Sequence, residues 1–215
     1  MNETKLKLLR NVKSTSGELE FPRIKPSGII PLNLIGFNEL LTADPELLKI
    51  SHIHFFLDDY QFERFWNAPT KYLDKLKKAR GVIGADYSCY VDAPNAFNMW
   101  NVFRNRLLDM FLQMHGVEVI PTAVWGGEKT FKWCFDGLPL NSIIAVNTFG
   151  SLKRSKQYFL KGFRKMMKVL KPHTVIVYGE VPEELQKEYG EQICNYASYC
   201  KTKWHKNRVR RSETE

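Results

Sequence analysis

Acidic side chains occur in this 215-residue chain directly after short apolar runs. Asp58 and Asp59 follow the run that begins at His52, and Asp86 follows the run that begins at Val82. Neighbouring carboxylates repel each other, so at least one of them needs a cation, a hydrogen-bond donor or a proton. A divalent metal bound by Asp58 and Asp86 would meet this need and would support hydrolysis of a phosphate ester. The alternative is structural, because Asp commonly caps the helix that follows a parallel strand.

Polar and aromatic residues also stand at the ends of the other apolar runs. In parallel α/β proteins, ligands bind at the carboxyl ends of the strands, where such residues meet. We therefore expect a second set of residues to bind the substrate. This set is Tyr60, Ser88, Tyr90, Asn101, Trp125, Asn147 and Tyr178.

A basic residue falls on the apolar face of the longest predicted helix, residues 96–115. At about 100° per residue the apolar side chains form one arc. Arg104 lies at the centre of this arc, whereas Arg106 falls on the opposite, solvated side. A buried guanidinium without a partner costs several kcal/mol, so we expect Arg104 to pair with Asp86 or Asp58. The pair could be purely structural, or Arg104 could hold a phosphate or carboxylate. The candidate catalytic residues are thus Asp58, Asp59, Asp86 and Arg104.

Apolar runs typical of strands alternate with segments of helical periodicity. We expect strands at 52–57, 82–87, 117–125, 142–149 and 174–178, and helices at 72–80, 96–115, 156–170 and 183–198. This alternation predicts an α/β fold with βαβ connections and a mainly parallel sheet of five or six strands. Such a sheet is open or resembles a truncated barrel, because a complete barrel needs eight strands. We expect an extended arm over 1–30, one α/β domain over 31–200 and a basic tail over 201–215.

The net charge of +9 is unevenly distributed. Residues 151–179 contain eight basic and no acidic side chains, and the last fifteen residues contain six basic and two acidic ones. Local basicity of this kind is typical of a surface that binds a polyanion, so nucleic acid is the expected partner. A solvated lysine-rich helix, an acidic protein or a membrane surface are the alternatives. The expected nucleic-acid contacts are Lys153, Arg154, Lys161, Arg164, Lys165, Lys168, Arg208, Arg210 and Arg211.

Several classes of protein do not fit the sequence. It contains no apolar run of about 18 residues, and its first residues lack the apolar segment of a secretory signal. Its four cysteines show no CxxC spacing. We therefore expect a protein of the bacterial host cytoplasm without a membrane partner. His52 and His54 match the histidine pair of metal-dependent rolling-circle nickases, but that assignment also needs a nucleophilic tyrosine on a suitably placed helix.

Several blocks of the chain together resemble a family of unknown function that occurs in bacteriophages, plasmids and other mobile elements of bacteria. The blocks are HFFLDDY (54–60), DYSCY (86–90), NVFRNR (101–106), VIPT (119–122), CFDG (134–137) and VYG (177–179). The resemblance covers roughly residues 30–180. It implies a mobile-element context but no reaction and no catalytic residues.

Together these features predict a phage- or plasmid-type protein that acts on or with nucleic acid. If it is an enzyme, we expect metal-assisted hydrolysis of a phosphodiester or a nucleotide. The main alternative is a non-catalytic nucleic-acid- or protein-binding accessory, such as a replication or regulatory factor or an inhibitor of a host defence protein. A small nucleotide as the ligand is a third possibility.

Overall fold

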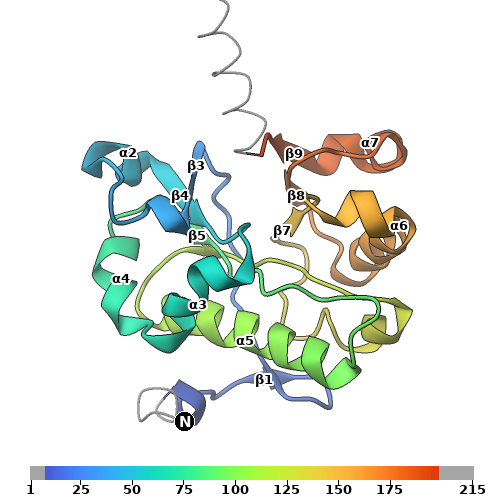
Figure 1. Cartoon of the computed structure of the whole chain (residues 1–215), viewed down its shortest axis with the longest axis horizontal. Helices are drawn as coiled ribbons and strands as arrows, with labels where there is room; N and C mark the ends of the chain where they lie inside the picture. Colours follow the sequence, from blue (N-terminus) through green and yellow to red (C-terminus); the bar gives the residue numbers. More distant parts are fainter. Residues whose placement is uncertain (1–7, 199–215) are drawn as a thin grey trace, which may run out of the picture.

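The framework of the protein is a series of parallel strands that follow one another in chain order. The computed structural model describes residues 8–198, apart from the side chains of residues 151, 153 and 154. One sheet contains β3 (Asn33–Gly36), β4 (Ser51–His54), β5 (Gly81–Ile83) and β6 (Val119–Ile120). The second contains β7 (Ile143–Asn147), β8 (Thr174–Tyr178) and β9 (Ile193–Tyr196). An isolated parallel bridge between Thr122 and Ala145 connects the two sheets, whose strands lie in the two halves of Figure 1.

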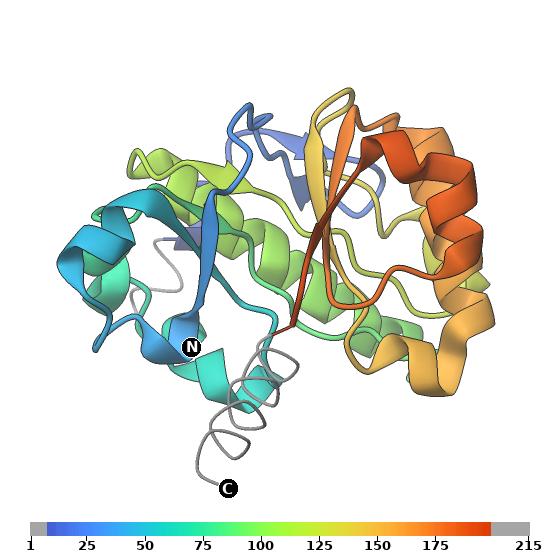
Figure 2. The same ribbon diagram turned by 90° about the horizontal axis from the view of Figure 1, so that it is seen from above.

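The two sheets share an apolar interior. One cluster contains residues from or next to five of the strands: Phe56, Ile83, Ile120, Ile143, Ala145, Ile176 and Tyr178. The outer strands also approach each other, because the hydroxyl of Tyr196 in β9 donates to the carbonyl of Pro31, just before β3, at 2.5 Å. The arrangement therefore resembles an incomplete barrel, which Figure 2 shows from above.

Helices cover the outer faces of both sheets. On the side of the first sheet these are α2 (Pro45–Ile50), α3 (Asp59–Asn67) and α4 (Thr70–Leu76), and on the side of the second they are α6 (Ser151–Leu170) and α7 (Glu183–Tyr189). Short 3-10 turns occur at Phe37–Glu39, Glu128–Lys132 and Gly190–Gln192. Within the described residues no helix has both the length and the apolar character that a membrane span requires.

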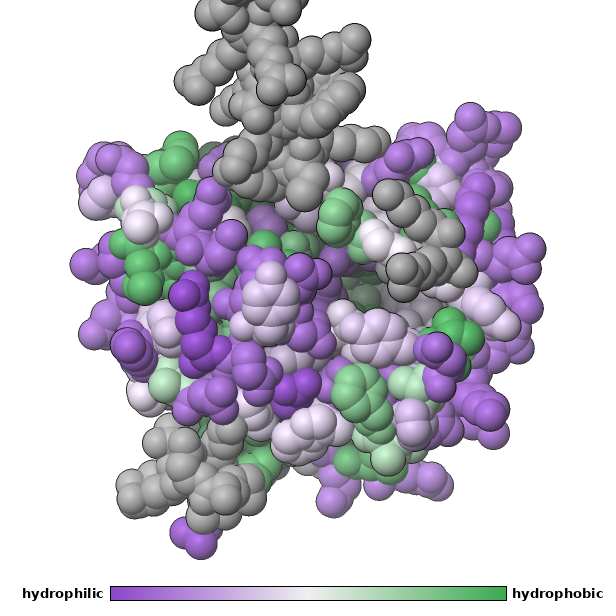
Figure 3. Space-filling view, in the orientation of Figure 1, coloured by the Kyte–Doolittle hydropathy of each residue, from purple (hydrophilic) through white to green (hydrophobic). Residues whose placement is uncertain are grey.

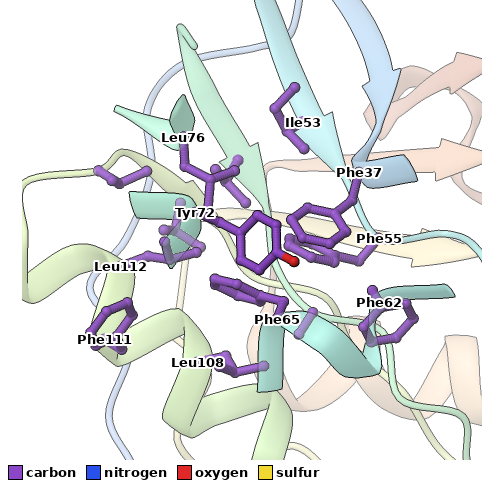
Figure 4. Packing of buried hydrophobic residues seen from close by; sticks show 14 of the residues in the cluster. Phe37, Ile53, Phe55, Phe62, Phe65, Tyr72, Leu76, Leu108, Phe111 and Leu112 are labelled. Atoms are coloured by element: carbon purple, nitrogen blue, oxygen red, sulfur yellow. The ribbon is translucent and has the colours of Figure 1, made fainter. Parts of the chain in front are cut away.

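Helix α5 (Asn95–Met114) runs beneath both sheets and joins their cores. Its C-terminal half places Leu108 and Phe111 in a cluster rich in aromatic rings, where the rings of Phe37 and Phe55 stack with centroids 4.8 Å apart (Figure 4). Its Val102 instead packs in the cluster formed by α6 and the second sheet. Because α5 contacts both halves, it is buried on most of its circumference.

The N-terminal segment, expected as an extended arm, also contacts the core. Its strands β1 (Thr15–Ser16) and β2 (Phe21–Pro22) form an antiparallel pair. Phe21 and Ile24 are both buried, each in a different core cluster.

All five predicted strands are present, but the prediction of five or six strands in one sheet is wrong in detail. The strands belong to sheets of four and three, and β3 and β9 are additional. The helix expected over 183–198 ends at Tyr189. The chain then forms β9, whose Ile193 pairs with Val175 of β8. Helix α3 was also not predicted, although Phe62, Phe65 and Trp66 form one buried face of it.

Candidate functional site

A cleft of about 830 Å³ opens where β5, β6 and β7 end. It lies on the face shown in Figure 3, which is hollowed between the part built on α3 and α5 and the part built on α6. Six of the residues predicted for the site line this cleft: Asp58, Asp86, Ser88, Tyr90, Trp125 and Asn147. Parallel strands bring their carboxyl ends to one edge, which explains how residues from positions 58 to 147 meet.

Asp86 is the most perturbed acidic group on the wall of the cleft. It follows β5, is only 7% exposed, and its Oδ2 accepts a hydrogen bond of 3.0 Å from Nδ2 of Asn147. Burial raises the pKa of Asp86 to about 8, the hydrogen bond from Asn147 opposes this shift, and the nearby Asp59 adds to it. The Asp86 carboxyl therefore holds a proton at neutral pH.

The predicted metal pair, Asp58 and Asp86, lies on the cleft wall, but the two side chains differ. Asp58 is exposed and accepts a hydrogen bond from Gln61, whereas Asp86 is buried and protonated. Metal ligation requires ionised carboxylates, so a cation would have to displace the proton of Asp86. Among residues 8–198, no three His, Cys, Asp or Glu side chains are grouped to hold a metal ion.

Asp59 supports the wall of the cleft from behind. Its half-buried carboxylate accepts hydrogen bonds from the hydroxyl of Ser88 at 3.1 Å and from the backbone N–H of Ser88 at 3.3 Å. Burial raises the pKa of Asp59, while the bonds from Ser88 and the charge of Arg104 lower it. Asp59 thus fixes the position of Ser88, the residue that faces the ligand space.

The predicted pairing of Arg104 with Asp86 or Asp58 is wrong. Its guanidinium donates to Glu63 at 3.1 Å and to Asn101 at 2.6 Å, and it lies over the ring of Tyr87 at 3.5 Å. Glu63 comes from α3, the helix that the sequence pattern did not reveal. Arg104 is not among the cleft-lining residues, so its contribution to the cleft passes through Asn101, whose amide donates to the carbonyl of Ser88 at 2.7 Å.

The prediction that Arg106 is solvated is also wrong. Arg106 is completely buried and donates to the carbonyls of Thr122, Cys134 and Asp136 at 3.0–3.2 Å. Asp109 lies one turn further along α5 and its charge acts on Arg106. The apolar arc suggested a single buried face, whereas α5 is enclosed by both sheets and by the loop over 133–137.

Three of the expected substrate-binding residues, Asn101, Tyr60 and Tyr178, do not line the cleft, and Asn101 is fully buried. Tyr60 is 78% exposed on α3, outside the cleft wall. Tyr178 is buried in the interior, where its ring lies 4.6 Å from His54 and 5.0 Å from Phe56. Conversely, Phe149, Tyr158 and Asp92 line the cleft and were not among the predicted residues. Phe149 could have been predicted from the sequence, because it stands two residues after the end of β7, whereas Asp92 lies nine residues after β5 in the loop before α5.

The histidine pair of β4 belongs to the core. His52 and His54 are both buried, and burial lowers the pKa of His52 to about 4 and of His54 to about 3. The backbone N–H of Phe56 donates to Nδ1 of His54, and neither ring nitrogen of His52 has a partner among the described residues. Both rings are therefore neutral at physiological pH.

The basic surface of α6 is partly neutralised. Lys161 forms an ion pair with Glu128, and Arg164 forms one with Glu188. Lys165 and Lys168 are exposed without an ion pair to any described residue. The side chains of Lys153 and Arg154 in the first turn of α6, and all of Arg208, Arg210 and Arg211, lie outside the described residues.

These features define a parallel α/β protein with a ligand-sized cleft at the carboxyl ends of its strands. The chain belongs to the family described as "Domain of unknown function (DUF4417)", whose family model matches residues 13–197. The "Gene 1 protein" of Mycobacterium phage L5 is 34% identical over 175 residues, 80% of this chain and 76% of that protein. The "Gene 1 protein" of Mycobacterium phage D29 is 32% identical over 175 residues, 80% of this chain and 65% of that protein. No solved structure matches the chain. The predicted phage-type family of unknown function is thereby supported.

Proposed function

We propose that this phage-type protein binds a nucleotide, either free or at the end of a nucleic-acid strand, in the cleft and hydrolyses it. The observation that carries this proposal is the buried carboxyl of Asp86, which accepts a hydrogen bond from Asn147 on the wall of a cleft with aromatic sides. An acid with a pKa near neutral pH is suited to donate a proton to a leaving group. Asp86 is accordingly the proposed general acid.

The walls of the cleft support a ligand that carries a base. Tyr90, Trp125 and Tyr158 line it, and aromatic side chains of this kind stack on nucleobases. Asn147 and Ser88 add hydrogen-bonding groups that can contact the edge of a base or a sugar. The aromatic sides and the few polar groups are together typical of a small-molecule site.

The start of α6 supports the placement of a phosphate at the rim. Gly150 lines the cleft directly before α6, and Lys153 and Arg154 belong to the first turn, which a break at Ser155 separates from the rest of the helix. Lysine and arginine are residue types that bind phosphate. A longer strand would continue toward Lys165 and Lys168, whose charges are available for the backbone.

Thermal unfolding with nucleotides tests the proposal. A set of ribo- and deoxyribonucleoside 5′-monophosphates should raise the melting temperature of the full chain, and chromatography should detect slow turnover. Asp86→Asn should retain the thermal shift and lose turnover by about 100-fold or more. If no nucleotide changes the melting temperature at millimolar concentration, the cleft does not bind nucleotides. Titration with Mn²⁺ tests the metal-assisted variant, in which stabilisation increases as the pH rises and Asp86 ionises.

A second candidate function, a non-catalytic accessory, is favoured by an exposed aromatic group beside the cleft. Tyr90, Phe97 and Trp100 are each more than 40% exposed, and the rings of Tyr90 and Phe97 lie 6.1 Å apart. Exposed apolar side chains that lie together commonly mark a partner surface. Binding of a single-stranded oligonucleotide that falls steeply with salt, depends on Trp100 and is unaffected by Asp86→Asn would favour this function.

A further inference from the structure

Resting on the proposed function, we infer that the bond cleaved in the cleft is the glycosidic bond between the base and the sugar of a nucleotide. The inference comes from the sign of the charges around the ligand space and from the different surroundings of two carboxyl groups, Asp58 and Asp86. It names the bond, which the proposed function leaves open, and it differs from the phosphate-ester hydrolysis that the sequence predicts.

The charged side chains on the described wall of the cleft are all acidic: Asp58, Asp86 and Asp92. No lysine, arginine or histidine occurs among the described residues that line it, and the side chains of Lys153 and Arg154, proposed above for the phosphate at the rim, lie outside the described residues. Phosphoryl transfer concentrates negative charge on the transferred group and is stabilised by cations. Cleavage of a glycosidic bond instead develops an oxocarbenium ion, a positive charge that carboxylates stabilise. The acidic wall therefore matches a cationic transition state.

Asp86 is held in position as a proton donor. The backbone N–H of Phe149 donates to Oδ1 of Asn147 at 2.9 Å, which turns Nδ2 of Asn147 toward Oδ2 of Asp86. No described residue forms a hydrogen bond with Oδ1 of Asp86, and Asp86 lines the cleft. One oxygen of the carboxyl is thus occupied by Asn147, and the other is available for the leaving base.

Asp58 supplies the complementary carboxylate. It is exposed on the cleft wall, whereas Asp86 is buried. Two carboxyl groups in such different surroundings can act as acid and base in one reaction. The Asp58 side chain lines the same ligand space from the start of α3 and can stabilise the cation or activate water.

The reaction needs only water as a co-reactant. Asp86 donates its proton to a ring nitrogen of the base, and the bond between C1′ and that nitrogen breaks, with its electron pair going to the base. Water adds to C1′ of the resulting oxocarbenium ion and gives a proton to Asp58. The products are the free base and the sugar phosphate, and proton transfer from Asp58 through solvent to Asp86 restores the starting state.

Product analysis tests the inference. The full chain is incubated with the adenine, guanine, cytosine and uracil nucleoside 5′-monophosphates and their 2′-deoxy counterparts, and free base and inorganic phosphate are quantified separately. We expect release of free base without release of phosphate. Asp86→Asn and Asp58→Asn should each lower this rate by about 100-fold. Asp74→Asn, an exposed aspartate of α4 outside the cleft, is the matched control and should be unchanged, and melting temperatures verify that each variant folds.

Different results would overturn the cleavage of the glycosidic bond and the more general hydrolysis of a nucleotide. Release of phosphate with the glycosidic bond intact overturns the inference and leaves the proposed function standing. A nucleotide-induced rise in melting temperature without any product overturns the inference and leaves only nucleotide binding. Neither a thermal shift nor a product overturns both. Equal base release by wild type and Asp86→Asn also contradicts the inference, since the proposed acid is then not used.

Discussion

Asn147 and Asp86 join the two parallel sheets through one hydrogen bond, from Nδ2 of Asn147 to Oδ2 of Asp86 at 3.0 Å. Asp86 follows β5 of the first sheet, and Asn147 ends β7 of the second. The bond therefore crosses between the sheets at the wall of the cleft. Loss of this bond would therefore affect both the contact between the sheets at the cleft wall and the pKa of Asp86.

Replacement of Asn147 by Ala should affect both the stability and the titration of Asp86. A buried acceptor that loses its donor costs about 1–3 kcal/mol, and urea unfolding measures this loss. Because the bond from Asn147 opposes the raised pKa of Asp86, its removal should raise that pKa further, as NMR titration of the carboxyl carbon would detect. An unchanged pKa would mean that the bond does not form in solution.

Asp86 should make folding less favourable as the pH rises. Its pKa is about 8 in the folded protein against an ordinary value of 3.8, so the folded state binds the proton more tightly. The stabilisation from this proton is complete below about pH 4 and is lost as the pH rises through about 8. Asp86→Asn cannot titrate, so its free energy of unfolding relative to wild type should increase between pH 5 and 9, by at most about 1.4 kcal/mol per pH unit. A difference that does not vary with pH would contradict the raised pKa.

The two arginines of α5 should differ in their importance for stability. Arg106→Met leaves the carbonyls of Thr122 and Cys134 without their buried donor and should cost about 3–5 kcal/mol in the free energy of unfolding. Arg104→Met frees Glu63, whose side chain is 41% exposed and can be hydrated, so its cost should be smaller. Chemical denaturation of the two variants provides the comparison. A larger loss for Arg104→Met would contradict the assignment of Arg106 as the more deeply buried residue of the pair.

Gly162→Ala should disturb one wall of the cleft. A Cβ at Gly162 would collide with the indole of Trp125, so Trp125 or α6 must shift. Overpacking of this kind costs about 1–3 kcal/mol even though Ala is the better helix former. The variant should also reduce the nucleotide-induced rise in melting temperature. Gly28→Ala is the matched control, because a Cβ there meets no atom within 4 Å. Equal behaviour of the two variants would show that Trp125 does not form a fixed wall.

The sequence was sufficient to place several cleft residues together because the rule behind the prediction is topological. Asp58, Asp86, Trp125 and Asn147 each stand at or after the end of a strand, and parallel strands end at one edge. The prediction needed only the alternation of strands and helices. It did not need the exact bounds of the strands, which are several residues shorter than expected.

The rest could not be predicted because it depends on packing between elements that are distant in the chain. The partner of Arg104 is Glu63, on a helix whose buried face consists of only three residues. The burial of Arg106 contradicts the assumption that a helix has one apolar side, since α5 lies between two sheets. The ion pairs of Lys161 and Arg164 likewise depend on Glu128 and Glu188, which a count of charge along the chain cannot locate.

The strand order has a consequence for synthesis of the chain on the ribosome. Since each strand pairs with the one made just before it, the first sheet can assemble while later residues are still being translated. Asn147, however, is made 61 residues after Asp86, so nascent chains that end before β7 leave this carboxyl group in water and ionised. We expect the neutral acid of the cleft to arise only when the second sheet docks, which makes its proton uptake a marker for the final step of folding.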